Sequence, residues 1–281
     1  SSFNWKNSGG LMDVELRTRR GMRYGAWYVA EYRIRQMSKW LGAIISVSFG
    51  NPIIYLLAIG IGVGSLVDSN TGGNGIYGVS YITFLAPALL ATAAIQAAMD
   101  ETSFPTLEGF VWNKSFFGMN STQLTAGQIV DGIMIAAFVR AFLTSAAYLV
   151  VLWAFGAVTV AAMPLLFLVA SFAGMSFGAL MLAATSFVKE DDGFFAIVAR
   201  FIVAPMFLFS GTFYPLEQMP IFLQWIGWIS PLWHSTNFAR SISFGLEVPG
   251  WLMIAHAAFL AISLVAGMLI ARRQFASRLL K

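Results

Sequence analysis

Residues 205–240 read PMFLFSGTFYPLEQMPIFLQWIGWISPLWHSTNFAR, an apolar and aromatic stretch that prolines interrupt. It begins as an apolar helix, breaks at Ser210, turns at Pro215 and Pro220, and continues as an aromatic segment up to Pro231. Its uninterrupted apolar runs are shorter than the ~20 residues that a helix needs to cross a bilayer. The sequence therefore predicts a hairpin that dips into one face of a membrane.

The composition indicates a membrane protein along its whole length. Of 281 residues, 58% are hydrophobic and only 11% are charged, and the mean hydropathy is +0.73. Soluble domains carry roughly a quarter charged residues. The absence of cysteine excludes disulfides, zinc-thiolate sites and thiol catalysis. We expect an all-α polytopic membrane protein, whose net charge of +4 comes from the basic flanks of its membrane helices and not from nucleic-acid binding.

Six apolar segments form an expected transmembrane domain over residues 41–281. The segments are 41–66, 79–99, 129–155, 160–188, 194–213 and 251–270. Asn51-Pro52 lies within the first and predicts a kink, because proline removes one helical hydrogen bond. The two long segments between spans are an inner connection at 100–128 and an outer hairpin at 214–248.

The residues before the first span divide into two parts. Residues 1–21 are polar, contain glycines and lack the apolar core of a signal peptide, which predicts a flexible cytoplasmic tail. Residues 22–40, MRYGAWYVAEYRIRQMSKW, interleave aromatic and basic side chains, as a helix lying at the lipid headgroups does. Arg33 falls among apolar neighbours on a helical wheel, so the two faces of this helix separate imperfectly.

Lysine and arginine set the orientation, because cytoplasmic loops carry an excess of both. With the N-terminus inside, the basic residues of both termini lie in the cytoplasm together with Lys114 and Lys189. Arg240 alone lies outside, while Arg140 and Arg200 lie within spans. We expect both termini in the cytoplasm, which places the hairpin on the outer face.

The sequence lacks the signatures of catalysis. No G-x-x-x-x-G-K-[ST] pattern occurs, so the chain cannot hydrolyse ATP through a P-loop of its own. His234 and His256 have no adjacent acidic residue or cysteine and are interpreted as structural. Acidic residues such as Asp100 and Asp131 lie at span ends, which disfavours ion coupling. We expect this chain to contain no catalytic residue and to bind no metal or cofactor.

Arg140 lies about 15 Å inside the third span, by the helical rise of ~1.5 Å per residue. An arginine at that depth is costly unless it is paired or faces a polar cavity. In the first of two interpretations, Arg140 contacts a polar or anionic group of a substrate. In the second it is structural, either in an ion pair or with its side chain extended toward a water-filled crevice. The sequence favours neither alternative.

A protein with many spans and no energy-coupling group of its own needs an energy source on another chain. The inner connection is where such a partner would dock. Within it, Phe116, Phe117, Met119 and Leu124 stand among small polar residues. They are compatible with a short helix that lies across the membrane and offers an apolar contact, or with an ordinary loop packed on its own domain.

Four stretches resemble the permeases of the type-2 ABC exporter family. They are NPIIYLLAIGIGVG at 51–64, YITFLAPALLATAAIQAAMDE at 81–101, FLFSGTFYPLEQMP at 207–220 and SPLWHSTNFAR at 230–240. The resemblance covers nearly everything after residue 22 and is most specific in FSGTFYPLEQMP. Within the family, the chain is most similar to the branch of nodulation-factor (lipo-oligosaccharide) exporter permeases and their drug-exporting relatives.

The resemblance implies an assembly in the cytoplasmic membrane of a bacterium. Two permease copies pair, expected to form a homodimer, and dock on two cytoplasmic ATP-binding subunits that hold ATP and Mg. The segment at about 115–127 acts as a coupling helix, and the outer hairpin helps to form the exit gate.

The resemblance also implies roles by position. The residues expected to couple to the ATP-binding subunit are Glu101, Ser115, Phe116, Phe117, Met119, Gln123 and Leu124. The residues expected along the substrate path are Phe84, Gln96, Arg140, Phe207, Phe209, Phe213 and Tyr214. The residues expected in the outer gate are Leu216, Glu217, Pro220, Trp225, Trp228 and Pro231. Glu217 and His234 are expected to fix the hairpin at the water interface, and Trp225, Trp228 and Trp233 to anchor it there.

These features favour ATP-driven export of an amphipathic substrate, a glycolipid, lipo-oligosaccharide or polysaccharide-like molecule, because aromatic lining suits such a molecule better than a small ion. One alternative is a multidrug or antibiotic efflux permease of the same family. A membrane-embedded lipid-processing enzyme is more remote, since it needs a nucleophile or an acid–base pair at membrane depth and none is visible. A channel would conduct without ATP. The sequence does not identify the substrate.

Overall fold

The computed structural model describes residues 6–280, with side chains from residue 21 onward except residue 22. Turns join the helices of this part, and Ile76 and Val79 form a single isolated β-bridge. The helical elements, in chain order, are α1 (Lys6–Ser38), α2 (Leu41–Tyr55), η1 (Leu56–Val63), α3 (Gly64–Asn70), α4 (Tyr81–Thr102), α5 (Phe104–Val111), α6 (Ser115–Asn120), α7 (Ala126–Ala154), α8 (Met163–Phe187), α9 (Phe194–Val198), η2 (Ala199–Val203), α10 (Ala204–Phe209), η3 (Leu216–Gln218), α11 (Ile221–Trp228), α12 (Pro231–Phe244) and α13 (Gly250–Leu279).

Within the described residues, five helices are long and apolar enough to cross a membrane, which confirms an all-helical membrane protein. They are Leu41–Asn70, Tyr81–Val111, Ala126–Ala154, Met163–Phe187 and Gly250–Leu279. The segment expected as a further span at 194–213 is shorter, since its apolar helix runs from Phe194 to Phe209. That length is about 24 Å by helical rise, against roughly 30 Å for a bilayer core. The helix ends next to Ser210, where the sequence predicts a break.

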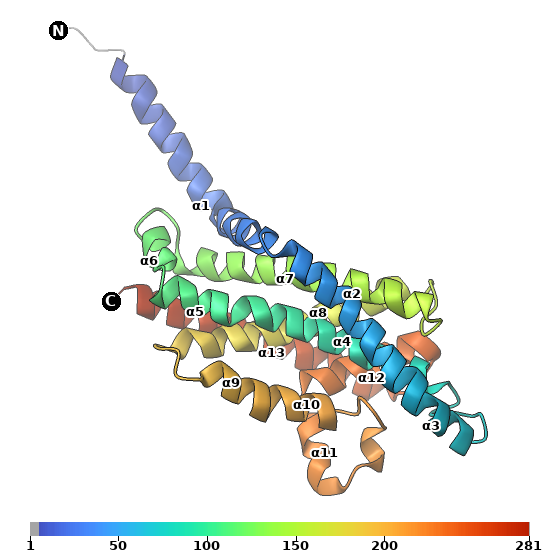
Figure 1. Cartoon of the computed structure of the whole chain (residues 1–281). Helices are drawn as coiled ribbons and strands as arrows, with labels where there is room; N and C mark the ends of the chain where they lie inside the picture. Colours follow the sequence, from blue (N-terminus) through green and yellow to red (C-terminus); the bar gives the residue numbers. More distant parts are fainter. Residues whose placement is uncertain (1–5, 281) are drawn as a thin grey trace, which may run out of the picture.

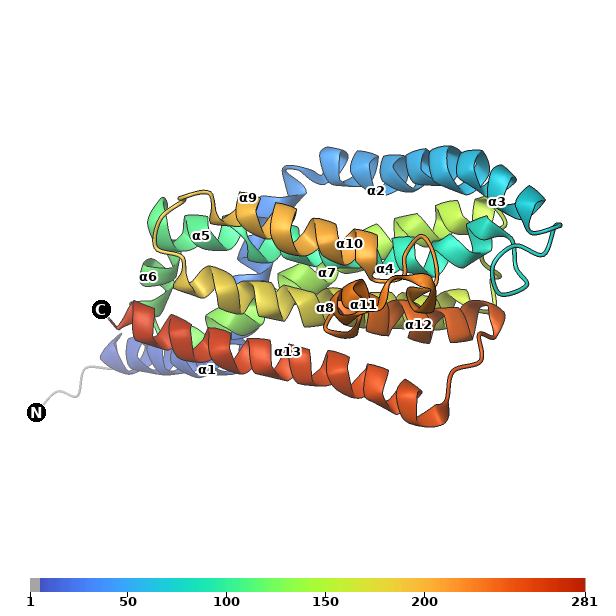
Figure 2. The ribbon, with the colours of Figure 1, turned by 90° about the horizontal axis from the view of Figure 1, so that it is seen from below.

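The first span is one continuous rod of α2, η1 and α3 at the periphery of the bundle (Figures 1 and 2). Pro52 lies inside α2, and the helix widens into the π-helical η1 at Leu56. Side chains such as Ile54 and Leu57 point away from the protein and are exposed. An exposed aliphatic surface is well solvated by lipid tails, which are themselves as apolar as leucine.

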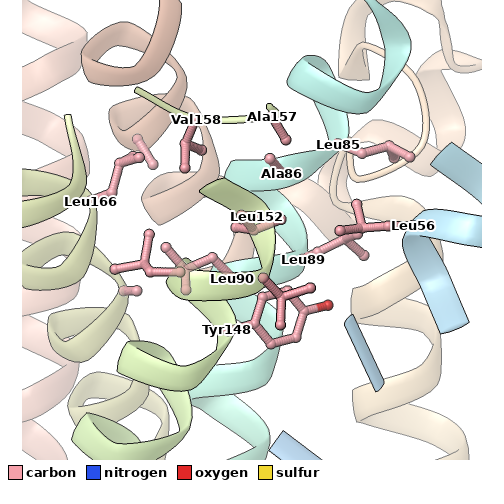
Figure 3. Close-up of a cluster of buried hydrophobic side chains, with 14 of the residues drawn as sticks. Leu56, Leu85, Ala86, Leu89, Leu90, Tyr148, Leu152, Ala157, Val158 and Leu166 are labelled. Carbon is pink, nitrogen blue, oxygen red and sulfur yellow. The ribbon is translucent and has the colours of Figure 1, made fainter. Parts of the chain in front are cut away.

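α4 and α8 lie at the centre of the bundle, in contact with each other and with α7 and α12 (Figure 2). One buried cluster joins Leu85, Leu89 and Leu90 of α4 to Tyr148 and Leu152 of α7 (Figure 3). α4 is buried along most of its length, which explains why its sequence carries apolar and small residues on every face.

Small residues let α4 and α8 approach closely. Gly174 and Gly178, one turn apart on α8, lie against Ala94 and Ala98 of α4. A Cβ atom at Gly174 would stand 2.7 Å from the carbonyl oxygen of Ala94, so glycine is required there. Membrane helices associate through such close packing, because burial in lipid supplies no hydrophobic driving force between them.

After Ser210 the chain turns through η3 and α11 and returns into the interior as α12. The hydroxyl of Ser210 donates to the hydroxyl of Ser230 over 2.8 Å, and both residues are buried, which closes the base of the hairpin. α12 packs against α4, α8 and α13. Trp233 on α12 is therefore buried, contrary to its expected interfacial position, whereas Trp225 and Trp228 are exposed.

α1 runs through both parts that were distinguished before the first span, since it begins at Lys6 and ends at Ser38. Residues 6–21 contain no proline that would stop the helix, although residues 1–5 and most side chains of the expected tail lie outside the described part. Further along, Val29, Arg33 and Met37 recur at helical spacing and are buried in the bundle. The exposed surface of this part holds Tyr24, Trp27 and Tyr28.

Candidate functional site

The bundle has two ends, which differ in chemistry (Figures 1 and 2). The end that holds α5, α6, the turn at 188–193 and the last turn of α13 is called the α6 end. The end that holds α3, the loop at 71–80 and the start of α13 is called the α3 end. The residues expected to have functional roles gather near both.

A buried ion pair joins α1 to α4 near the α6 end. The guanidinium of Arg33 donates from Nε to Glu101 Oε1 at 2.9 Å, and its Nη2 lies 2.8 Å from the same oxygen. It also donates to the carbonyl oxygens of Pro105 and Glu101 at 2.7 and 2.9 Å. Both residues are only 3% exposed, so these four contacts replace the water that each charge loses on burial.

Arg140 of α7 extends this network. Its Nη2 lies 2.8 Å from Asp100 Oδ2, and its Nη1 lies 3.8 Å from Glu101 Oε2. The side-chain amide of Gln96 donates a hydrogen bond to the other oxygen of Asp100, Oδ1, at 2.8 Å. Of the two interpretations of Arg140, the structure shows the ion pair. The pair is partly exposed, however, and it faces a cavity.

The cavity has a volume of about 670 Å³ and opens between the end of α1, α2, α4 and α7. Its charged lining consists of Arg33, Lys39, Asp100, Glu101, Glu108 and Arg140. Trp40, Ile44, Val47, Ala93 and Tyr148 supply apolar and aromatic surface. This size lies within the range of ~300–1,000 Å³ of small-ligand sites. A site with both charged and apolar walls suits an amphipathic molecule, and it contains Gln96 and Arg140 of the expected path.

The inner connection at 100–128 forms α5 and α6 at the α6 end, and the expected coupling segment within it, 115–127, forms α6 and the start of α7. Phe116 is fully buried, because its ring packs edge-on against Phe110 at 5.0 Å and lies 5.6 Å from Phe275. It therefore does not offer the apolar contact to a partner that was expected of it. Phe117 and Met119 are partly buried. Ser115, Leu124 and Gln123 lie beside them, the first two partly buried and Gln123 exposed. The carboxylate of Glu101, also expected to couple, forms an ion pair with the guanidinium of Arg33.

Of the aromatic residues expected along the substrate path, all within the described part, only Phe207 and Phe213 contact each other through their rings. Phe207 packs edge-on against Phe213 at 5.1 Å and against Tyr55 of α2 at 5.9 Å. Phe209 is partly buried beside the hairpin, and Tyr214 is exposed. Phe84 is fully buried, with the guanidinium of Arg240 3.7 Å above its ring. In this arrangement Phe84 belongs to the core and does not line the cavity.

The expected gate residues occupy both sides of the hairpin. Leu216 is buried against Gly227 and Trp233, which fixes η3 to α11. Glu217 is exposed and accepts a hydrogen bond from the hydroxyl of Tyr77 over 3.1 Å. The remaining gate residues are Pro220, Trp225 and Trp228, which are exposed, and Pro231, which is buried in the first turn of α12.

Two buried polar features were missed by the sequence reasoning. Arg240, expected as an outer charge, is 1% exposed and donates to the carbonyl oxygens of Phe84 and Thr212, both at 3.2 Å. His234 and His256 face each other with their Nδ1 atoms 2.8 Å apart, and His234 Nε2 lies 2.9 Å from the carbonyl oxygen of Trp228. No spacing in the sequence indicates either contact, because both join separate helices.

Residues 27–244 match the family described as ABC-2 type transporter, from within α1 to the end of α12. The chain belongs to the ABC-2 type transporter family. This confirms the resemblance found in the four sequence stretches, and it makes the chain a membrane-embedded ABC-2 permease, a kind of subunit that works with an ATP-binding partner.

Relatives of this ABC-2 permease cover most of its length. Nodulation protein J of Rhizobium leguminosarum bv. viciae is 29% identical over 92% of this chain and 96% of that protein. Its counterpart from bv. trifolii is 30% identical over 79% of this chain and 82% of that protein. The probable multidrug ABC transporter permease YbhR of Escherichia coli K12 is 24% identical over 58% of this chain and 44% of that protein. No solved structure matches.

Proposed function

We propose that this ABC-2 permease is the membrane subunit of an ATP-driven exporter that moves an amphipathic molecule out of the cytoplasm or the inner leaflet. The observation that carries the proposal is the family match over 27–244, with Nodulation protein J aligned along nearly its full length. A glycolipid, lipo-oligosaccharide or polysaccharide-like substrate suits the cavity at the α6 end, whose walls are both charged and apolar.

The charge distribution supports an orientation with the α6 end in the cytoplasm of a bacterium. Lys114, Lys189, Arg272 and Arg273 lie at or near that end, whereas the α3 end carries acidic side chains such as Glu217. Cytoplasmic loops carry the excess of basic residues. Both termini then lie inside, α1 lies along the inner headgroups, 194–213 is a short sixth span, and the hairpin dips into the outer face.

ATP and Mg would be held by the partner, in two ATP-binding subunits under a pair of identical permeases. The contact would be made by α6 and the residues around it, because α6 projects at the α6 end of the bundle, packed on α5, α7 and α13. Phe117 and Met119 are the apolar side chains of α6 left partly uncovered by the bundle. Movement of α6 would reach the network through α5, which follows Glu101 directly.

A multidrug efflux permease is the second candidate. The Escherichia coli relative, a probable multidrug ABC transporter permease, favours it. An exporter of drugs and an exporter of glycolipids differ in the head group that the cavity must accept, so a substrate screen separates them.

The test is co-purification of the full chain with its ATP-binding subunit, followed by ATPase measurements in nanodiscs with candidate glycolipids and drugs. Phe117→Ala and Met119→Ala should each reduce docking and ATPase stimulation. Trp225→Ala, an exposed apolar residue of the hairpin, is the matched control and should leave docking unchanged. The proposal fails if no ATP-binding subunit binds, or if the chain alone conducts ions or converts lipid without nucleotide.

A further inference from the structure

A second cavity, of about 380 Å³, lies at the α3 end. It is enclosed by the loop at 71–80, η3, the inner part of α12 and the connection to α13. Its polar lining consists of Tyr77, Glu217, Gln218, Asn237 and Glu247, and its apolar lining of Pro215, Leu246, Val248, Pro249 and Leu252. None of these residues belongs to the cavity at the α6 end.

The charge of this cavity is negative. Glu217 and Glu247 contribute two carboxylates, and none of the described residues that line the cavity is basic. Glu247 is exposed and forms no hydrogen bond or ion pair within the described part of the chain. Arg240 is close enough for its charge to act on Tyr77 and Glu217. Its guanidinium is nevertheless buried behind the cavity, over the ring of Phe84, and it does not line the space.

Asn237 provides an independent indication of a ligand. It is 9% exposed and stands on α12, the buried arm of the hairpin. Its side chain lines the cavity and forms no hydrogen bond within residues 23–280. Because the amide makes no internal hydrogen bond in this range, a ligand or water in the cavity must satisfy it. The amide is thus placed to hold a polar molecule inside the cavity.

The remaining polar groups are mostly acceptors. Tyr77 donates to Glu217, and burial, followed by the charge of Glu217, raises the pKa of Tyr77 to about 12. The phenol therefore stays protonated and holds one carboxylate in place. The other oxygen of Glu217, both oxygens of Glu247 and the amide oxygens of Gln218 and Asn237 accept no hydrogen bond within the described part of the chain. A protonated amine offers three donors and a positive charge, which matches this set.

We propose that the acidic cavity at the α3 end binds a small organic cation through its ammonium group, with the body of the molecule against Leu246 and Leu252. The volume is above the ~300 Å³ at which small-ligand sites begin, so it holds more than a bare ion. This proposal does not depend on the proposed export function. It concerns binding at the α3 end of the bundle, opposite the α6 end, and needs no ATP-binding subunit.

The experiment titrates the purified full chain in nanodiscs with glucosamine and, separately, with glucose, by isothermal titration calorimetry at neutral pH and low salt. The two sugars have the same ring, and only glucosamine carries an ammonium group. Saturable glucosamine binding, with glucose at least ~10-fold weaker, is expected from the charge-assisted contacts. Equal binding of both sugars would overturn the proposal in favour of a polyol site, and absence of glucosamine binding would overturn it outright.

Matched substitutions assign the site. Glu217→Gln and Glu247→Gln should each raise the glucosamine Kd roughly tenfold, and the double variant should abolish binding. Glu190→Gln changes an exposed carboxylate at the other end and should leave the Kd unchanged. Since Glu247 makes no internal contact in the described part, its variant tests the proposal even if loss of the contact from Tyr77 to Glu217 disturbs folding. An unchanged Kd in E247Q would refute the assignment.

Discussion

Replacing Arg33 by methionine removes the positive charge of the pair that fastens α1 to α4. The substitution keeps an unbranched apolar stem, shorter than that of arginine, and removes the four contacts of the guanidinium to Glu101 and to the Pro105 carbonyl. Glu101 is then left 3% exposed, with a charge that only Arg140 can approach, at 3.8 Å.

The expected destabilisation follows from that burial. Removing one partner of a buried ion pair typically costs about 3–5 kcal/mol. The lower end applies here, because Arg140 partly replaces Arg33 as the partner of Glu101. A loss of about 3 kcal/mol corresponds to a fall in Tm of about 6–12 °C for a protein of this size class. Glu101→Gln should cost less than Arg33→Met, since Arg33 keeps its two carbonyl acceptors.

The assay is thermal unfolding of the detergent-solubilised full chain, followed by tryptophan fluorescence. Arg35→Met is the matched control: its pair with Glu31 has a contact of 2.6 Å but is exposed, so about 0.5 kcal/mol is expected. The double variant Arg33→Met, Glu101→Leu should cost less than the two single changes added, by about 1–3 kcal/mol. The reasoning is refuted if Arg33→Met shifts Tm no more than Arg35→Met, or if the two single costs add.

Four further substitutions test the packing of α6, the contact of α4 with α8 and the role of Arg140. Phe116→Ala should lower the free energy of unfolding by about 3–5 kcal/mol, because it removes a fully buried aromatic ring. Phe117→Ala should leave Tm nearly unchanged, because Phe117 is only partly buried. Similar losses of Tm in the two variants would contradict this difference in burial. Gly174→Ala should destabilise the chain by about 1–3 kcal/mol, since its Cβ would meet the Ala94 carbonyl oxygen at 2.7 Å; an unchanged melting curve would show that α4 and α8 separate freely. Arg140→Gln should reduce transport in vesicles while the folded protein persists, because its pair is partly exposed; loss of folded protein instead would make Arg140 structural.

The sequence predicts the membrane helices well because apolar length and small residues are local properties. The segments around α2, α4, α7, α8 and α13 follow directly from them. Arg33 shows the limit of such reasoning. Its position on an apolar face is visible on a helical wheel, but its partner Glu101 lies 68 residues further along. Which acid it meets depends on how α1 and α4 pack, and no local pattern carries that information.

Aromatic and basic residues near the helix ends were harder to place. Phe116 and Phe117 are adjacent and chemically identical, yet only Phe116 is fully buried, because Gly109 leaves room for its ring. Arg240 lies within the hairpin at 214–248 and counts as an outer charge in the sequence. It is buried because the ring of Phe84 and two backbone carbonyls replace its water. Such compensation arises only once distant segments have met.

His234 of α12 and His256 of α13 face each other, and their hydrogen bonds determine which ring nitrogens carry protons. The Trp228 carbonyl can only accept, so His234 carries its proton on Nε2 and its Nδ1 is an acceptor in the neutral ring. His256 must then donate from Nδ1, which leaves its Nε2 as a bare lone pair, buried and without a partner in the described part of the chain. The pair can gain one proton there without losing its hydrogen bond, but a second would set two N–H groups against each other. The histidine contact between α12 and α13 can therefore take up one proton but not two while its hydrogen bond persists. Nitrogen-15 chemical shifts of the two imidazoles would report which ring nitrogens carry protons.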